Sequence, residues 1–210
     1  MIIDCIADLH GYYPELEGGD LLIVAGDLTA TDLPHEYLKF GLWLNEQKYK
    51  RKIVIGGNHD NLIQKVAVIF DGLPDFVFTY LFDSGTEFEG LKIWGSPWTK
   101  TFEGMNPKCK AFTVDTEEEL DEKFSMIPTD IDILVTHNPP YGIMDRSIHN
   151  TKINFGNKYL LNKFRGSNLK LHVFGHFHEC AGEHYGKIIY INASLVNEHY
   201  QPVNKPIRVI

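Results

Sequence analysis

The chain has 210 residues, of which 43% are hydrophobic and 23% are charged, and its formal net charge is −8 at pH 7. This composition is ordinary for a folded globular protein, and the acidic balance argues against non-specific nucleic-acid binding, which depends on clustered lysine and arginine. No apolar run approaches transmembrane length, and the first expected strand begins at Ile2, so we expect no signal peptide, no membrane partner and a cytoplasmic location.

Short apolar runs bounded by turn residues predict buried strands. In chain order they cover residues 2–7, 21–25, 52–56, 131–136, 170–174, 187–192 and 206–210. Capping signals and helical spacing predict helices from about Asp32 to Leu44 and over residues 61–70, 116–125 and 156–165.

The central part of the chain has a different pattern. The segments FVFTYLF, TEFEG and LKIWG, within residues 76–95, are typical of shorter strands joined by turns, more antiparallel than crossover-like. Residues 96–112 lack a clean periodicity, as long functional loops often do. We therefore expect an α/β fold, a four-layer αββα sandwich of two mixed β-sheets flanked by helices, in a single domain over residues 1–210.

Five of the predicted strands end in residues of the types that bind metals. These clusters are Asp8-Leu9-His10, Gly26-Asp27, Asn58-His59-Asp60, His137-Asn138 and His176-Phe177-His178. Ligands bind outside the carboxyl ends of the strands in open α/β sheets, so the clusters predict a polynuclear metal site there. Mixed imidazole, carboxylate and amide donors favour Mn, Fe, Zn or similar ions over Ca or Mg.

Each cluster alone is weak evidence, because Asp-x-His pairs and Gly-Asp turns are common without a metal. The joint pattern carries the prediction. The histidines outside these clusters are interpreted as ordinary structural or surface residues: His35, His149, His172, His184 and His199. The cysteines Cys5, Cys109 and Cys180 are far apart and lack a CxxC motif, which favours reduced thiols over a disulfide framework.

In order and spacing, the clusters resemble the motifs of the calcineurin-like metallophosphoesterases. The segments Gly26-Asp27-Leu28-Thr29, Gly95-Ser96-Pro97-Trp98 and Thr136-His137-Asn138-Pro139-Pro140 are similar to the metallophosphoesterase-domain (MPPED-type) phosphodiesterase branch. The resemblance implies two divalent ions, with manganese favoured and Fe, Zn, Co or Ni as alternatives. The implied ligands are Asp8, His10, Asp27 and His178 for the first ion, and Asn58, His137 and His176 for the second, with Asp27 as the bridge.

The resemblance also implies that His59 is catalytic and that Asp60 orients its ring, although Asp60 fits a helix N-cap almost as well. The Ser/Thr protein phosphatase branch has arginines near its Gly-Asp and Asn-His motifs, and this chain has none beside either motif, which disfavours protein phosphatase activity. We expect a phosphodiesterase that hydrolyses small phosphodiesters, cyclic nucleotides among them, through attack by a metal-bridging hydroxide. A phosphomonoesterase or nucleotide pyrophosphatase on the same centre, and a metal-binding scaffold without turnover, are the open alternatives.

Four residues are candidates for substrate binding: Asn58, His59, Trp98 and Asn138. Trp98, together with Phe102, could stack on a nucleobase, and the alternative is that Trp98 packs into the core. Asn138 could contact phosphate or shape the Pro-Pro turn. The expected partner is a small phosphodiester or nucleotide, with no obligate protein partner.

Overall fold

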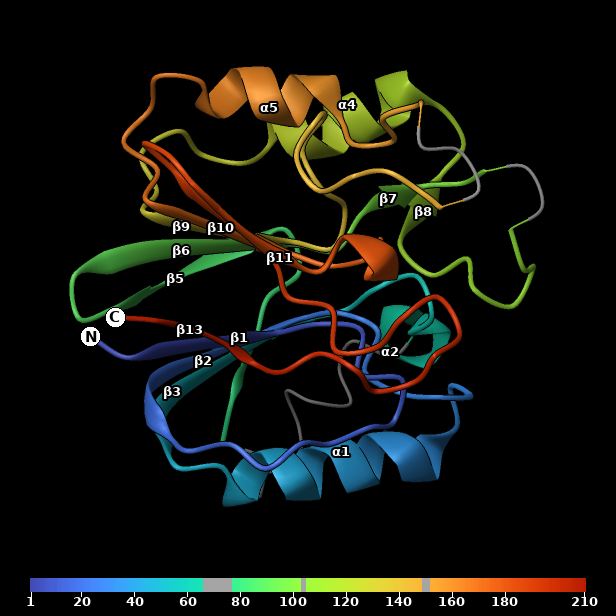
Figure 1. Ribbon diagram of the computed structural model, residues 1–210, viewed down its shortest axis with the longest axis vertical. Helices are drawn as coiled ribbons and strands as arrows, with labels where there is room; N and C mark the ends of the chain where they lie inside the picture. The colour runs from blue at the N-terminus through green and yellow to red at the C-terminus, as the bar shows by residue number, and fades with distance from the viewer. Residues whose placement is uncertain (66–76, 103–104, 149–151) are drawn as a thin grey trace.

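Two β-sheets face each other in the computed structural model, and helices cover the outer side of each sheet (Figure 1). The structure describes residues 1–65, 77–102, 105–148 and 152–210. The predicted αββα arrangement of two mixed sheets is confirmed. The strands of both sheets are short and rich in branched apolar residues, which pack well on a pleated, buried surface.

The first sheet has the strand order β13-β1-β2-β3-β4. Its strands are β1 (Ile3–Ile6), β2 (Gly19–Ala25), β3 (Tyr49–Ile55), β4 (Thr79–Tyr80) and β13 (Ile207–Val209). Strands β1 to β4 are parallel, and β13 pairs antiparallel with β1, so the two ends of the chain lie close together (Figure 1). The parallel direction of β4 corrects the expectation of antiparallel pairing in that segment. The backbone N–H of Leu81 still bonds to the first sheet, at Val54, before the chain enters the second.

The second sheet has the order β11-β12-β10-β9-β6-β5. Its strands are β5 (Ser84–Phe88), β6 (Leu91–Ser96), β9 (Ile133–Thr136), β10 (Leu171–Phe174), β11 (Gly182–Tyr185) and β12 (Ile189–Asn192). Strands β5 and β6 form the predicted antiparallel hairpin, while β6, β9, β10 and β12 are parallel. The short pair β7 (Thr99–Lys100) and β8 (Thr113–Val114), and the polar edge strand β11, lack the apolar pattern that would have predicted them.

The helices are α1 (Pro34–Glu46), α2 (Asn61–Lys65), α4 (Glu117–Ser125) and α5 (Lys158–Phe164). Residues 66–70 of the predicted 61–70 helix lie outside the described residues. Helix α4 begins with a capping box, in which Thr116 Oγ1 accepts from the N–H of Glu119 and the Glu119 carboxylate accepts from the N–H of Thr116. Helix α1 covers the first sheet, and α4 and α5 cover the second (Figure 1). Within the described chain, no helix is both long and apolar enough to cross a membrane.

The facing sides of the sheets bury a layer of aliphatic residues, among them Ile23, Ile55, Val135 and Val173. The sheets are also tied to each other at one edge, where the N–H of Ala7 donates to Ala193 and the N–H of Leu195 donates to Ala7. This edge holds the carboxyl ends of β1, β2, β3, β9 and β10. The loops that follow these strands are therefore brought together from both sheets.

Candidate metal centre

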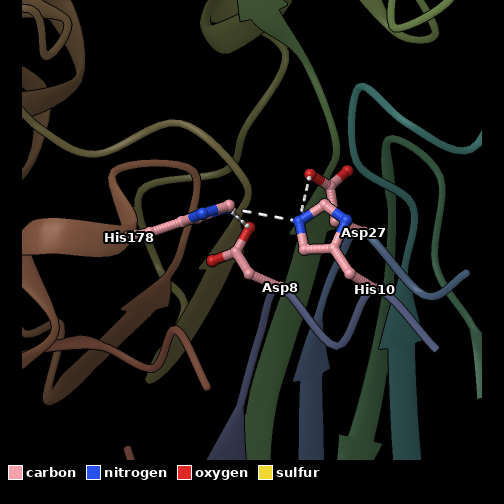
Figure 2. A group of neighbouring side chains, drawn as sticks. All are labelled: Asp8, His10, Asp27 and His178. Carbon is pink, nitrogen blue, oxygen red and sulfur yellow. Dashed lines mark hydrogen bonds and ion pairs between the residues drawn. The ribbon is translucent and has the colours of Figure 1, made fainter. Parts of the chain in front are cut away.

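Four side chains from three of these loops converge at the sheet edge. Asp8 and His10 follow β1, Asp27 follows β2, and His178 begins the short 3-10 helix η1 (His178–Cys180) after β10. Figure 2 shows the four pointing toward one another, and their candidate ligand atoms all lie within 4.8 Å of each other. His10 Nε2 lies 3.2 Å from His178 Nε2 and 3.6 Å from Asp27 Oδ2. Donor atoms this close fit around one divalent ion, whose bonds to nitrogen and oxygen are about 2.0–2.2 Å.

A second group of donors shares Asp27 with the first. His137 Nε2 lies 3.4 Å from Asp27 Oδ2 and 3.1 Å from Asn58 Oδ1. The ring of His176 lies 5.1 Å from that of His137, centroid to centroid. The structure thus brings all seven sequence-predicted ligands to one edge, with Asp27 between the two groups.

The backbone is strained at several of these positions. Asp8, His10, Asp27 and His176 have φ angles of 51°, 42°, 56° and 72°. Non-glycine residues with positive φ are uncommon, cost about 1–3 kcal/mol each and concentrate at functional sites. The positive φ angles turn the chain sharply, so that Asp8 and His10 of one short loop both reach the site.

Hydrogen bonds orient the ligand rings. The carbonyl of Ala25 accepts from Nδ1 of His137 at 2.8 Å, and the carbonyl of Asn197 accepts from Nδ1 of His178 at 3.2 Å. A ring that donates from Nδ1 keeps the lone pair on Nε2 free for a metal. The Ser194 hydroxyl donates to Asp8, and the N–H of His176 donates to both Asp8 oxygens. These contacts orient the donor atoms toward the site.

The glycines of two motifs permit a close approach to the carboxylates. A Cβ atom on Gly57 would overlap Asp27 Oδ1, and one on Gly175 would overlap Asp8 Oδ2. Because glycine alone lacks a Cβ atom, the glycine that begins the Gly-Asn-His-Asp motif and the one that begins the Gly-His-x-His motif allow the backbone to pack directly against the ligands.

Electrostatics favour the protonation states that a metal requires. Burial would raise the pKa of Asp8, but the charges of His178 and His137 outweigh it and lower this pKa to about 2. The pKa of Asp27 is likewise held well below its usual range, chiefly by His137 and against the effect of burial. Burial lowers the pKa of His10 to about 4. Ionised carboxylates and neutral imidazoles are the forms that bind cations, so the residues present fit a divalent metal site.

His137 and His178 are exceptions, because nearby carboxylates outweigh the effect of burial on their rings. Asp27 raises the pKa of His137 to about 9, and Asp8 raises the pKa of His178 above its usual value. A divalent ion bound at Nε2 of either ring would displace its proton.

His59 faces the shared carboxylate from the solvent side. Its Nε2 lies 3.8 Å from Asp27 Oδ2, and 18% of its side chain is exposed. On the other side of the ring, Nδ1 lies 3.4 Å from Cys109 Sγ. The ring is therefore placed next to the ligand groups and contacts a thiol at the nitrogen that points away from them.

The contacts of Asp60 correct the expectation that it orients the His59 ring. Its fully buried carboxylate accepts from the N–H groups of Gly57 at 2.8 Å, Asp27 at 3.0 Å and Leu28 at 3.1 Å. Burial and the charge of Asp27 raise the pKa of Asp60 to about 8, while hydrogen bonds from the N–H groups of Gly57 and Leu28 act in the opposite direction. Asp60 fastens the loop after β3 to the loop after β2, and acts on the site through the backbone.

Two candidate substrate contacts are structural instead. Trp98 is only 9% exposed, donates from Nε1 to Asp83 at 2.6 Å and lies under the Lys123 amino group. Asn138 is buried, and its amide donates to the carbonyl of Pro139 at 2.8 Å. The core and turn alternatives therefore hold for these residues. Of the histidines outside the motifs, His172 is buried, His35, His184 and His199 are exposed, and His149 lies outside the described residues.

A cavity of about 660 Å³ opens beside His59. Cys109, Tyr200, Lys65 and Lys108 are among the residues that line it. Sequence reasoning missed Cys109 and Tyr200, and also Asn197 and Ser194, because none of them belongs to a strand-end motif. A residue that approaches the site only through the tertiary fold leaves no local signal in the sequence.

Comparison with known proteins agrees with this geometry. The sequence profile of the calcineurin-like phosphoesterases matches residues 1–180, and the chain therefore belongs to this family of metal-dependent phosphoester hydrolases. The chain is 36% identical over 229 residues to metallophosphoesterase domain-containing protein 1 of Homo sapiens, with 97% of this chain and 68% of that protein covered. The Mus musculus protein of the same name gives the same values. The resemblance inferred from the motifs is confirmed.

A solved structure supports the fold. Phosphopantetheinyl hydrolase from Mycobacterium tuberculosis superposes with a TM-score of 0.68 at 15% identity, over 99% of this chain and 95% of that chain. At this level of identity the comparison shows a shared fold.

Proposed function

We propose that this protein is a phosphodiesterase that uses two divalent ions, manganese first among them, to hydrolyse small phosphodiesters such as cyclic nucleotides. The observation that carries the proposal is the placement of His59 beside Asp27, the carboxylate that faces both groups of ligands. When bound, two ions at such a centre polarise the phosphoryl oxygens and lower the pKa of a water ligand.

The side chains of the protein have two further roles, metal binding and proton donation. Asp8, His10, Asp27 and His178 would hold one ion, and Asn58, His137 and His176, with Asp27 shared, would hold the other. His59 would donate a proton from Nε2 to the departing ester oxygen, a role worth roughly 10²- to 10⁴-fold in rate. The partly exposed edge of its ring leaves room for a substrate to approach.

The types of basic side chain near the site favour a diester over a monoester as the substrate. Arginine forks bind the oxygens of a phosphate in pairs, and among the residues that the structure describes no arginine lines the cavity beside His59. A diester carries one negative charge and depends less on such a clamp than a dianionic monoester does.

A nucleotide pyrophosphatase on the same centre is the second candidate. Lys65 and Lys108 line the cavity, where they could bind a further phosphate of the substrate. Hydrolysis of dinucleoside pyrophosphates in preference to simple diesters would favour this candidate.

The test uses chelator-treated protein with and without added Mn²⁺, and compares bis(4-nitrophenyl) phosphate with 4-nitrophenyl phosphate. We expect Mn²⁺ to restore cleavage, with the diester preferred. His59→Ala should lose most of the turnover while it keeps the wild-type metal content, and His184→Ala, an exposed histidine on β11, should behave as wild type. If metal-loaded protein cleaves neither of these compounds nor any of a panel of cyclic nucleotides, the scaffold alternative replaces the proposal.

A further inference from the structure

The ring of Tyr200 lies against the histidines of the metal centre. Its centroid is 4.7 Å from that of His10, 5.4 Å from that of His178 and 6.0 Å from that of His59, and each pair is arranged edge to face. Tyr200 is nevertheless 53% exposed. One side of this residue packs on the site, and the rest is open.

Tyr200 occupies this position at a conformational cost. Its φ angle is +59°, in the left-handed region that non-glycine residues seldom adopt. The N–H of Tyr200 donates to the carbonyl of Asn197, and Asn197 Oδ1 accepts from the N–H groups of His199 and Gln201. The partial burial of the ring does not explain why Tyr200 adopts a strained backbone conformation. A contact between the ring and a molecule bound at the site would explain it.

The same turn acts on the metal centre. The carbonyl of Asn197 accepts from Nδ1 of His178, so one loop orients a ligand and carries the tyrosine. This loop lies beyond residues 1–180, the part of the chain that matches the family profile. The predicted ligands, which lie within the segment that matches the family profile, and the loop that carries Tyr200 therefore come from different parts of the chain.

Tyr200 also lines the cavity of about 660 Å³, together with His59 and Cys109. His59 lies where the cavity adjoins the predicted metal-binding side chains. A group attached to a phosphoryl unit at the metal centre would thus enter the cavity beside the tyrosine ring.

We infer that Tyr200 determines substrate specificity by stacking on a planar ring in the ester group of the substrate. The inference rests on the proposed function for its biological meaning, but it concerns a binding contact that does not require turnover. Stacking of a planar ring on an aromatic side chain accounts for about a tenfold difference in affinity.

The experiment measures binding to the Mn²⁺-loaded protein by calorimetry, with phenylphosphonate and methylphosphonate as probes. Both probes carry the same anionic group and resist hydrolysis, so their affinity ratio reports the ring alone. We expect wild type to bind phenylphosphonate about tenfold more tightly. Tyr200→Asn should bring the ratio close to one, and Tyr200→Phe should retain it. Asparagine is chosen because it tolerates positive φ.

Two controls separate a local effect from a general one. The metal content of each variant is measured, and Tyr185→Asn removes an exposed tyrosine on β11 that lies outside the cavity lining. The inference is overturned if wild type does not distinguish the probes, or if Tyr200→Asn keeps the wild-type ratio. Failure of the proposed function would appear separately, as bound phosphonate without hydrolysis of any diester.

Discussion

The Sγ atom of Cys109 lies 3.4 Å from Nδ1 of His59, and the Cys109 carbonyl accepts from the side-chain amide of Asn58. One residue therefore contacts both an expected ligand and the expected proton donor. Burial raises the pKa of this thiol, so Cys109 acts as a neutral neighbour of the imidazole. Cys109 thus occupies the position beside the His59 ring that the family resemblance predicts for Asp60.

Loss of this thiol should slow turnover without removing the metals. We expect Cys109→Ala to lower kcat about three- to tenfold, because a neutral hydrogen bond contributes about 0.5–1.5 kcal/mol. Cys109→Ser, which keeps a hydrogen-bonding atom in place, should lie closer to wild type. Steady-state kinetics and metal analysis check both variants, and equal kcat in Cys109→Ala and wild type would rule out a role in orienting His59.

Removal of the Asp60 carboxylate should destabilise the fold. In Asp60→Ala the buried N–H groups of Gly57, Asp27 and Leu28 lose their acceptor. We expect the free energy of unfolding to fall by about 3 kcal/mol or more, from the cost of unsatisfied buried donors. Urea denaturation of chelator-treated protein measures this, and Asp130→Ala, at an exposed ion pair with Lys92, is the control, with a change within about 0.5 kcal/mol. A similar small change in Asp60→Ala would contradict the anchoring role.

Divalent metal should stabilise the protein, and Asp27 should carry much of the effect. A ligand at 100 times its Kd adds about 2.7 kcal/mol to the free energy of unfolding. Asp27→Asn should lose most of this gain at the same Mn²⁺ concentration, because Asp27 Oδ2 faces both His10 and His137. Urea titrations with and without Mn²⁺ give the gain for each protein. A full gain in Asp27→Asn would show that the carboxylate is not a ligand.

Acid should destabilise the metal-free protein partly through His172. The Thr136 hydroxyl donates to the carbonyl of Asn138 and accepts from Nε2 of His172 at 2.8 Å, and burial lowers the pKa of this histidine to about 3. In the unfolded chain His172 binds a proton near pH 6.5, whereas in the folded chain it stays neutral down to about pH 3. The free energy of unfolding therefore falls as pH drops through this window, by about 1.4 kcal/mol per pH unit for this group.

His172→Gln keeps a donor for Thr136 and cannot titrate. Its free energy of unfolding should therefore fall less steeply between pH 6 and pH 4 than that of wild type, and the two slopes should differ by the equivalent of about one proton. Urea denaturation at a series of pH values measures the slope. The exposed His184→Gln is the matched control and should retain the wild-type slope. Identical slopes in wild type and His172→Gln would refute the assignment.

Local patterns predicted much of the site because its ligands come directly after strands. An apolar run such as Leu22–Ala25 has few ways to be buried other than as a strand, and its last residue then places Asp27 at the carboxyl edge. The local sequence does not constrain the contacts of the Asp60 and Trp98 side chains in this way. Asp60 accepts from backbone groups of a separate loop, and Trp98 packs where the segment after β6 meets the helices, so both roles depend on tertiary contacts.

The amino-acid sequence by itself determined the buried strands, the types of residue that follow them and the family, since each depends on residues close together in the chain. Only the tertiary structure decided which atoms meet across it. Cys109 reaches His59 from 50 positions away, and Tyr200 reaches His10 through a strained turn beyond the family motifs. Such contacts are set by the packing of the two sheets against each other, which no local spacing encodes.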